Sequence, residues 1–161
     1  IFVTKIEDKN GNVLSTFSAV KNEAISKNAA YLMIDLLKSV VNQGTSVRLR
    51  LRYNLNGEIA AKTGTTNNHS DGWFMAIVPK LTCGVWVGGE ERSIHFDNLS
   101  IGQGANMALP VFALFIQKVY ADPSLNIYPT DTFEKPETIT YSLDCGTKEE
   151  EVDVYEDEFF N

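Results

Sequence analysis

Apolar and polar residues alternate in two short stretches at the start of the chain, residues 2–7 and 13–17. A period of two residues is typical of a β-strand with one covered face. Between the stretches lie residues 8–12, which contain the pair Asn10-Gly11. Both residue types tolerate the positive φ angles of tight turns, so the pattern predicts a β-hairpin that opens the chain.

Apolar residues then recur with helical spacing over residues 25–41. Their positions are Ile25, Ala29, Leu32, Met33, Leu36, Leu37, Val40 and Val41. The Ser26 hydroxyl suits the N-cap of such a helix, and Gly44 follows its last apolar residue. The spacing predicts an amphipathic helix of about four turns.

Three stretches with strand character follow at residues 58–66, 72–79 and 83–89. Short turn segments rich in glycine, threonine and proline separate them, which favours three adjacent strands of one sheet. The predicted fold class is α/β, in the α+β sense: an antiparallel sheet flanked by helices.

A second helical pattern extends from Met107 to Val119 and is stopped by Asp122-Pro123. The chain beyond it is rich in proline and threonine and then acidic. The sequence therefore predicts a domain portion over residues 1–122, followed by a strap and an acidic tail over residues 123–161.

Composition narrows the class of protein. The chain has 161 residues and a net charge of −7, but residues 1–143 hold 13 acidic and 13 basic residues, so the excess lies in a tail that we expect to be solvated. The absence of a basic excess argues against a nucleic-acid partner.

No apolar run reaches the roughly 18 residues of a membrane span. The chain begins at Ile1, which leads us to expect a piece of a longer protein.

Cysteine and histidine spacing indicates neither a zinc site nor a hydrolase triad. Cys83 and Cys145 form no C-x-x-C pair, and His69 and His95 lack partners at recognisable spacing. We expect Cys83 to be a buried thiol in its apolar strand and both histidines to lie in surface loops. The sequence does not decide whether the two cysteines form a disulfide.

The motif that carries chemistry is Lys62-Thr63-Gly64, followed by Thr65 and Thr66 at the end of a predicted strand. A lysine and hydroxyl groups at one strand edge are suited to hold a substrate carboxylate, and glycine lets a substrate approach the backbone. A backbone N–H at such an edge can also stabilise an oxyanion. K-T-G is one of three signatures of serine acyl-transfer enzymes related to penicillin-binding proteins.

The surrounding sequence resembles class A penicillin-binding proteins over about residues 1–120. The matching segments are residues 4–14, 40–45, 60–68, 71–74 and 84–89. The resemblance implies the C-terminal portion of a transpeptidase domain, which cross-links peptidoglycan through a serine acyl-enzyme and binds β-lactams covalently. It implies no metal or organic cofactor.

The resemblance also implies the roles of individual residues. Lys62 would act in the catalytic hydrogen-bond network, and Thr65 N–H would form half of the oxyanion hole. The hydroxyls of Thr63 and Thr65 would bind the terminal carboxylate of a D-Ala-D-Ala stem peptide, with Gly64 and Thr66 completing the substrate-binding strand. Thr66 itself favours class A, because class B enzymes more often carry alanine there.

The family requires two further motifs, S-x-x-K with the nucleophile and S-x-N, and both should precede the hairpin. The matches in this chain, at residues 18–21 and 26–28, follow it and nearly touch. We interpret Ser18 as part of a connection and Ser26 as a helix cap. The nucleophile is thus expected in a missing upstream segment, this chain alone should not acylate, and its uncovered surfaces should favour a homodimer.

By resemblance, the parent protein would carry a glycosyltransferase domain and an N-terminal membrane anchor and would act in the periplasm or otherwise outside the cytoplasmic membrane. Two alternatives remain open: a D,D-carboxypeptidase or β-lactamase-like hydrolase, and a non-enzymatic module that binds the cell wall.

Three smaller patterns complete the expectations. Arg48, Arg50 and Arg52 alternate with leucines, which predicts an extended segment with a solvated basic face. Trp73 and Phe74 are expected to be core residues. The pair of glycines at 102 and 104 is expected to let the last helix approach the sheet.

Overall fold

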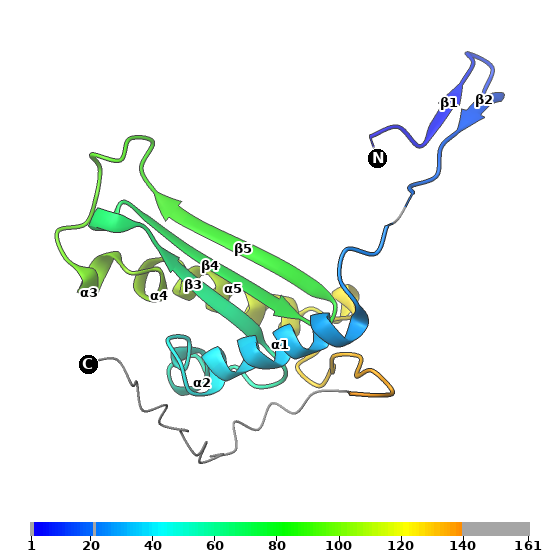
Figure 1. Cartoon of the computed structure of the whole chain (residues 1–161). Helices are drawn as coiled ribbons and strands as arrows, with labels where there is room; N and C mark the ends of the chain where they lie inside the picture. The colour runs from blue at the N-terminus through cyan, green and yellow to red at the C-terminus, as the bar shows by residue number, and fades with distance from the viewer. Residues whose placement is uncertain (1, 21, 140–161) are drawn as a thin grey trace, which may run out of the picture.

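The computed structural model describes residues 2–20 and 22–139. It begins with the hairpin of β1 (Lys5–Glu7) and β2 (Val13–Thr16), as predicted. Asp8 closes its turn by accepting hydrogen bonds from the backbone of Asn10 and Asn12, and Gly11 supplies a positive φ of 85°. The hairpin stands apart from the rest of the described chain (Figure 1).

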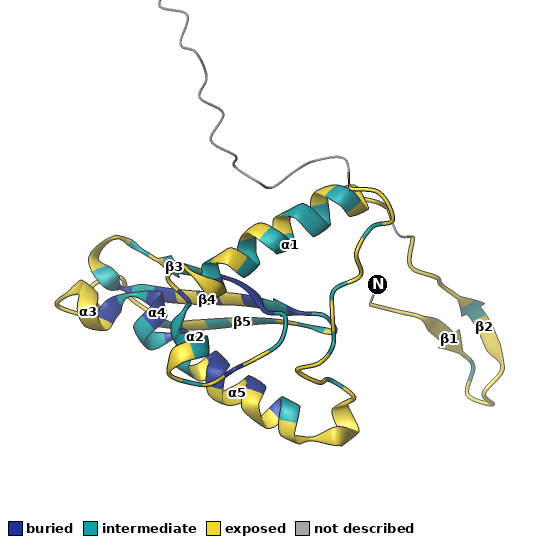
Figure 2. Ribbon diagram, turned by 90° about the horizontal axis from the view of Figure 1, so that it is seen from below, coloured by how far each residue is buried: buried dark blue, intermediate teal, exposed yellow. Residues whose placement is uncertain are grey.

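Helix α1 (Lys27–Asn42) is also confirmed. The Ser26 hydroxyl accepts a hydrogen bond of 3.2 Å from the N–H of Ala29 and so caps the first turn. The helix packs along β3 (Ala60–Thr65), on the side of the sheet opposite α5 (Leu109–Ala121) (Figure 2). Val41 is fully buried.

The second sheet has three strands in the order β3, β4 (Asp71–Val78) and β5 (Leu81–Gly88), all antiparallel. A short 3-10 turn, η1 (Asn67–His69), joins the first two strands. Both outer strands of this sheet have one edge that pairs with no other strand within residues 2–20 and 22–139. The predicted antiparallel sheet is therefore present, with the K-T-G strand at its edge.

Three helices follow the sheet: α3 (Leu99–Gly102), α4 (Gly104–Met107) and α5 (Leu109–Ala121). Helix α5 covers one face of the sheet, where Phe112 meets Phe74 with their ring centroids 5.3 Å apart. Both rings are buried. The remaining short helix, α2 (Arg48–Leu51), lies between α1 and β3 in sequence and buries Leu49 in the same core.

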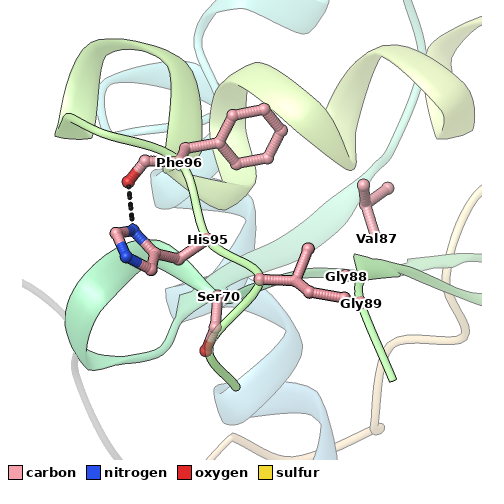
Figure 3. A pocket seen from close by; sticks show the side chains of 7 residues that line it. Ser70, Val87, Gly88, Gly89, His95 and Phe96 are labelled. Carbon is pink, nitrogen blue, oxygen red and sulfur yellow. Dashed lines mark hydrogen bonds between the residues drawn. The ribbon is translucent and has the colours of Figure 1, made fainter. Parts of the chain in front are cut away.

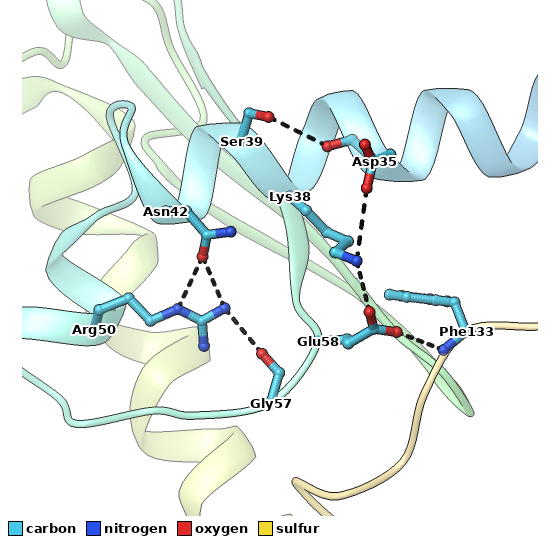
Figure 4. A network of polar contacts seen from close by, with 8 residues as sticks. All are labelled: Asp35, Lys38, Ser39, Asn42, Arg50, Gly57, Glu58 and Phe133. Atoms are coloured by element: carbon cyan, nitrogen blue, oxygen red, sulfur yellow. Dashed lines mark hydrogen bonds and ion pairs between the residues drawn. The ribbon is translucent and has the colours of Figure 1, made fainter. Parts of the chain in front are cut away.

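The strap predicted after residue 122 begins with η2 (Pro123–Leu125) and contains no helix or strand over residues 126–139. It is fastened just before β3, where Glu58 accepts a hydrogen bond from Lys38 through one carboxylate oxygen and from the N–H of Phe133 through the other (Figure 4). Asp131 pairs with Lys80 at 3.0 Å. The acidic tail and Cys145 lie outside the described residues.

Two remaining expectations can be compared with the described residues. Cys83 is half-buried on the face that packs against α5, less enclosed than predicted, and burial raises the pKa of its thiol. In the part of the chain that the structure describes, no helix combines the length and apolar character that crossing a membrane requires.

Candidate functional site

The register of the sheet separates the K-T-G residues onto two faces. Lys62 lies opposite Met75 and Gly64 opposite Trp73, whereas Thr63 lies opposite Phe74. Directly opposed residues in an antiparallel pair share a face. Thr63 and Thr65 therefore lie on the face covered by the C-terminal helices, and Lys62 and Gly64 lie on the other.

The backbone of β3 directs alternate N–H groups to its free edge. The N–H of Thr66 bonds to the carbonyl of Asp71 on β4 at 3.0 Å. Because successive residues of a strand direct their N–H groups to opposite sides, the N–H groups of Thr63 and Thr65 point away from β4. No other described strand occupies that edge. The edge therefore presents main-chain donors next to the threonine hydroxyls.

Thr65 is joined to the helical layer by its side chain. Its Oγ1 accepts a hydrogen bond of 2.9 Å from the N–H of Gly104, the first residue of α4. A Cβ at Gly104 would lie 2.5 Å from the carbonyl oxygen of Gly64 and 2.6 Å from that of Trp73, so only glycine fits. This confirms that a glycine lets the last helical region approach the sheet. The Thr65 hydroxyl still has its own proton to donate.

Thr63 contacts Thr45, for which no role was predicted from the sequence. Its Oγ1 lies 3.2 Å from Oγ1 of Thr45, in the turn between α1 and α2, and either hydroxyl is able to donate. The two residues are 18 positions apart. Two features of the sequence pointed to this position: a Gly-Thr pair directly after an amphipathic helix, and the place of Thr45 in the matching segment 40–45.

The prediction for Arg48, Arg50 and Arg52 is wrong, because the segment forms helix α2 instead of an extended strand. Arg50 is half-buried and donates to the carbonyls of Leu55 and Gly57 and to Oδ1 of Asn42. Figure 4 shows its bonds to Gly57 and Asn42. Burial lowers the pKa of Arg50. These acceptors lie at the end of α1 and in the connection between α2 and β3, and local alternation could not reveal them.

Arg48 also departs from the solvated face that was predicted. It is half-buried, and its Nη1 donates to the carbonyl of Ala105 at 3.2 Å. Ala105 follows Gly104, whose N–H binds Thr65. A guanidinium is thus held against the same short helix that contacts the Thr65 hydroxyl.

Lys62 is exposed on the opposite face, and its Nζ donates to the carbonyl of Thr63 at 2.9 Å. Beside it lie Trp73, Met75 and Trp86, which we call the open face; their exposed fractions are 45%, 44% and 47%. The prediction that Trp73 belongs to the core is therefore wrong, whereas Phe74 is fully buried as expected. Alternation placed them on opposite faces but did not tell which face is covered.

Thr66 belongs to a polar cluster at the turn that follows the motif. Its Oγ1 lies 3.0 Å from Oγ of the buried Ser70 and accepts from the N–H of Asp71 at 2.9 Å. Hydrogen bonds from Trp86, Ser70 and Thr66 outweigh desolvation and lower the pKa of Asp71. The Thr66 hydroxyl is therefore engaged in the hydrogen bonds that stabilise this turn.

Beside this turn lies an open cavity of about 230 Å³ (Figure 3). Its walls are Ser70, Val87, Gly88, Gly89, Ile94, His95 and Phe96. The ring nitrogen Nδ1 of His95 lies 3.1 Å from the carbonyl of Phe96. The lining is mainly apolar and contains none of the K-T-G residues.

Ser18 and Ser26 lie where they were predicted, in a connection and at a helix cap. Ser18 is exposed between the hairpin and α1, in a stretch without secondary structure. Ser26 uses its hydroxyl as the cap of α1. Neither serine is among the residues that contact Lys62 or the threonines of β3 through hydrogen bonds.

Comparison with known proteins gives one family match and many relatives. Residues 1–90 match the description "Penicillin binding protein transpeptidase domain". The chain is 33% identical over 135 residues to Penicillin-binding protein 1A of Aquifex aeolicus, covering 84% of this chain and 17% of that protein. It is 39% identical over 84 residues to Penicillin-binding protein 1A of Clostridium novyi, covering 52% and 10%. The chain thus spans a small part of these relatives.

A solved structure shares the fold. The crystal structure of Penicillin-Binding Protein 1A from Haemophilus influenzae aligns with 84% of this chain and 24% of its own, with a TM-score of 0.60 and 19% sequence identity. At that identity the likeness concerns the fold, and it agrees with the α/β class predicted from the sequence.

Proposed function

This chain belongs to the transpeptidase family of penicillin-binding proteins, and we propose that it forms the K-T-G wall of a peptidoglycan D,D-transpeptidase site. The relatives, named Penicillin-binding protein 1A and 1B, agree with the class A resemblance of the sequence. The observation that carries the proposal is the free edge of β3, where main-chain N–H groups, two threonine hydroxyls and a lysine come together.

The terminal carboxylate of a D-Ala-D-Ala stem peptide would bind at the threonine side of the edge. The Thr65 hydroxyl has a proton to donate, the Thr63 hydroxyl has one when Thr45 is the donor in their contact, and carboxylate oxygens only accept. Arg48 adds a positive charge beside α4, the helix that contacts Thr65. Hydrogen bonds to an ionised group are about twice as strong as neutral ones, so the arrangement favours an anionic substrate end.

The acyl centre would lie along the same edge. There the N–H of Thr65 would bind the oxygen that becomes negatively charged when a serine attacks the carbonyl carbon. Donors of this kind contribute about 3 to 4 kcal/mol in acyl transfer. Lys62 would take part in proton transfer around the serine. The C–N bond to the terminal D-alanine then breaks, and the acyl group passes from the serine oxygen to the amine of a second stem peptide.

The nucleophile itself is proposed to come from a segment other than residues 1–161. Ser26 is engaged in capping, and Ser18 lies in the connection between the hairpin and α1. This connection runs away from β3 in Figure 1. The open face of Trp73, Met75 and Trp86 adjoins Lys62, so a segment that brings a serine to Lys62 would cover it. Such burial would stabilise the complex by about 25 cal/mol per Å² of apolar surface.

The same proposal includes the partners and location implied by the family. Stem peptides and β-lactams are the proposed ligands, and the site of action is proposed to be outside the cytoplasmic membrane, in a protein anchored there. A hydrolase would give the acyl group to water, and a wall-binding module would not form an acyl-enzyme. The reaction products therefore distinguish a transpeptidase from a hydrolase and from a wall-binding module.

The test is intact-mass spectrometry after incubation with benzylpenicillin. Three samples are compared: residues 1–161, the same chain with Ser18→Ala, and a joined polypeptide. In the joined polypeptide, residues 1–161 follow the part of Penicillin-binding protein 1A from Aquifex aeolicus that precedes its matching region. We expect a mass increase of one penicillin in the joined polypeptide alone. A shift in residues 1–161 that disappears in Ser18→Ala would overturn the assignment of the nucleophile.

The fate of the acyl group provides the second readout. Incubation of the joined polypeptide with a D-Ala-D-Ala peptide and a second peptide bearing a free amine should yield the cross-linked product. Release of D-alanine with only the hydrolysed peptide would instead indicate a carboxypeptidase.

A further inference from the structure

The turn between α1 and α2 holds Thr45 in a fixed place. The N–H groups of Gly44 and Ser46 both bond to the carbonyl of Val40 at 3.1 Å. A Cβ at Gly44 would lie 2.9 Å from the Cα and the carbonyl oxygen of Val40, so the approach of this turn to the helix end requires glycine. Ser46 is fully buried on the other side. Thr45 is thus an exposed residue between two anchored neighbours.

Either Thr45 or Thr63 donates the hydrogen bond between them, and this choice decides whether Thr63 keeps a proton for a ligand. The two Oγ1 atoms lie 3.2 Å apart, and a hydroxyl has only one proton. If Thr63 donated to Thr45, it would have no proton left for a carboxylate. If Thr45 donates, Thr63 accepts through a lone pair and keeps its proton for the ligand, and donation in a chain strengthens each bond.

We propose that Thr45 is a positioning residue of the carboxylate site: its hydroxyl donates to Thr63 and directs the Thr63 proton toward the substrate's terminal carboxylate. This inference rests on the proposed function. The carboxylate accepts and never donates, so its arrival selects the chain Thr45 to Thr63 to carboxylate. Thr45 therefore raises the selectivity of the site for a free carboxylate over an ester or amide.

The experiment compares acylation of the joined polypeptide by benzylpenicillin and by its methyl ester, which lacks the carboxylate charge. The second-order rate constant is followed by intact mass. The variants are Thr45→Val, which removes the hydroxyl and keeps the shape, Thr45→Ala as a second deletion, and Thr45→Ser, which restores a hydroxyl. Thr63→Val is the comparison within the site. Thr132→Val is the control, at an exposed threonine of the strap.

We expect Thr45→Val and Thr45→Ala to lower the ratio of free acid to ester rate constants by about 5- to 10-fold, the size of one lost hydrogen bond. Thr45→Ser should return the ratio to within about 2-fold of the original, and Thr132→Val should not change it. A purely structural role would lower both rate constants together and leave their ratio constant.

The inference is overturned if the ratio is unchanged in Thr45→Val and Thr45→Ala while Thr63→Val lowers it, and the proposed function then stands without it. A failure of serine to restore the ratio also overturns it. If the unaltered joined polypeptide reacts with neither compound, the proposed function is contradicted and the role of Thr45 is overturned with it.

Discussion

Glu58 and Phe133 are 75 positions apart, yet the Phe133 N–H donates to Glu58 Oε2 at 2.6 Å. The other carboxylate oxygen accepts from Lys38 Nζ, also at 2.6 Å. One side chain therefore fastens the strap, helix α1 and the start of the K-T-G strand together (Figure 4). The strap is part of the folded unit and is not a loose extension after α5.

Replacement of this carboxylate should weaken the fold at neutral pH. Glu58→Gln loses two charge-assisted hydrogen bonds, and we expect the free energy of unfolding to fall by about 1 to 2 kcal/mol in urea titrations at pH 7. Lys80→Met, which breaks the more exposed pair with Asp131, is the matched comparison and should cost less than about 1 kcal/mol. An equal loss in both variants would contradict the central place given to Glu58.

The same carboxylate predicts a pH dependence. Desolvation alone would raise the pKa of Glu58, but the hydrogen bonds from Lys38 and Phe133 outweigh it and lower the pKa. A lowered pKa in the folded state gives stability that is present above the ordinary glutamate pKa of about 4.3 and is lost as the pH falls through the folded value. The difference between the original chain and Glu58→Gln should therefore shrink between about pH 5 and pH 3.

Helix α5 offers a paired test of its buried and exposed faces. Phe112 is buried against Phe74, whereas Phe115, one turn later, is exposed. We expect Phe112→Ala to lower the free energy of unfolding by about 3 to 5 kcal/mol, because it leaves a cavity. Phe115→Ala should stay within about 0.5 kcal/mol of the original in the same urea titration. Comparable losses would mean that α5 packs through a different face.

Ser46 predicts a gain in stability. Its Oγ is buried and has no hydrogen-bond partner among the residues that the structure describes. A buried hydroxyl without a partner is unfavourable, so Ser46→Ala should raise the free energy of unfolding by about 1 kcal/mol. Ser39→Ala, at an exposed serine of α1, should have little effect. A loss of stability in Ser46→Ala would show that its hydroxyl has a partner after all.

The open face predicts self-association of residues 1–161 when they are prepared alone. Trp73 and Trp86 lie directly opposite each other and are about half exposed, next to the unpaired edge of β5. Such surfaces favour contact with a second copy. Light scattering should show a mass that rises with concentration, and a Trp73→Thr, Trp86→Thr variant should reduce the rise. A monodisperse monomer at high concentration would contradict the homodimer expectation.

Local patterns predicted much of this fold. The hairpin around Gly11, the cap at Ser26 and the three strands depend on residues close in sequence, and each is present where it was predicted. Helix α2 was missed because it has only four residues, too few for a period to be read, and because Arg50 binds carbonyls from other turns. Nonlocal acceptors cannot be inferred from alternation.

Only the part of the site that depends on residues close in sequence could be predicted. The K-T-G strand and its threonines follow from the motif, but the roles of Lys62, Thr63, Gly64, Thr65 and Thr66 stay predictions until acylation is measured. The contact of Thr45 with Thr63 joins two elements across a turn, and only the packing of α1 along β3 brings them together. The side of the sheet that Trp73 occupies likewise depends on which face a helix covers.

The fit of Gly104 against the carbonyls of Gly64 and Trp73 depends on the register between β3 and β4. A slip of one residue between β3 and β4 would exchange the faces of the strand and turn Lys62 toward the helices and Thr63 toward the open face. In that arrangement the Thr65 hydroxyl could not meet the N–H of Gly104. Docking of α4 is therefore compatible only with the pairing that places the threonines and the lysine on their observed faces, so it selects this register over its neighbours.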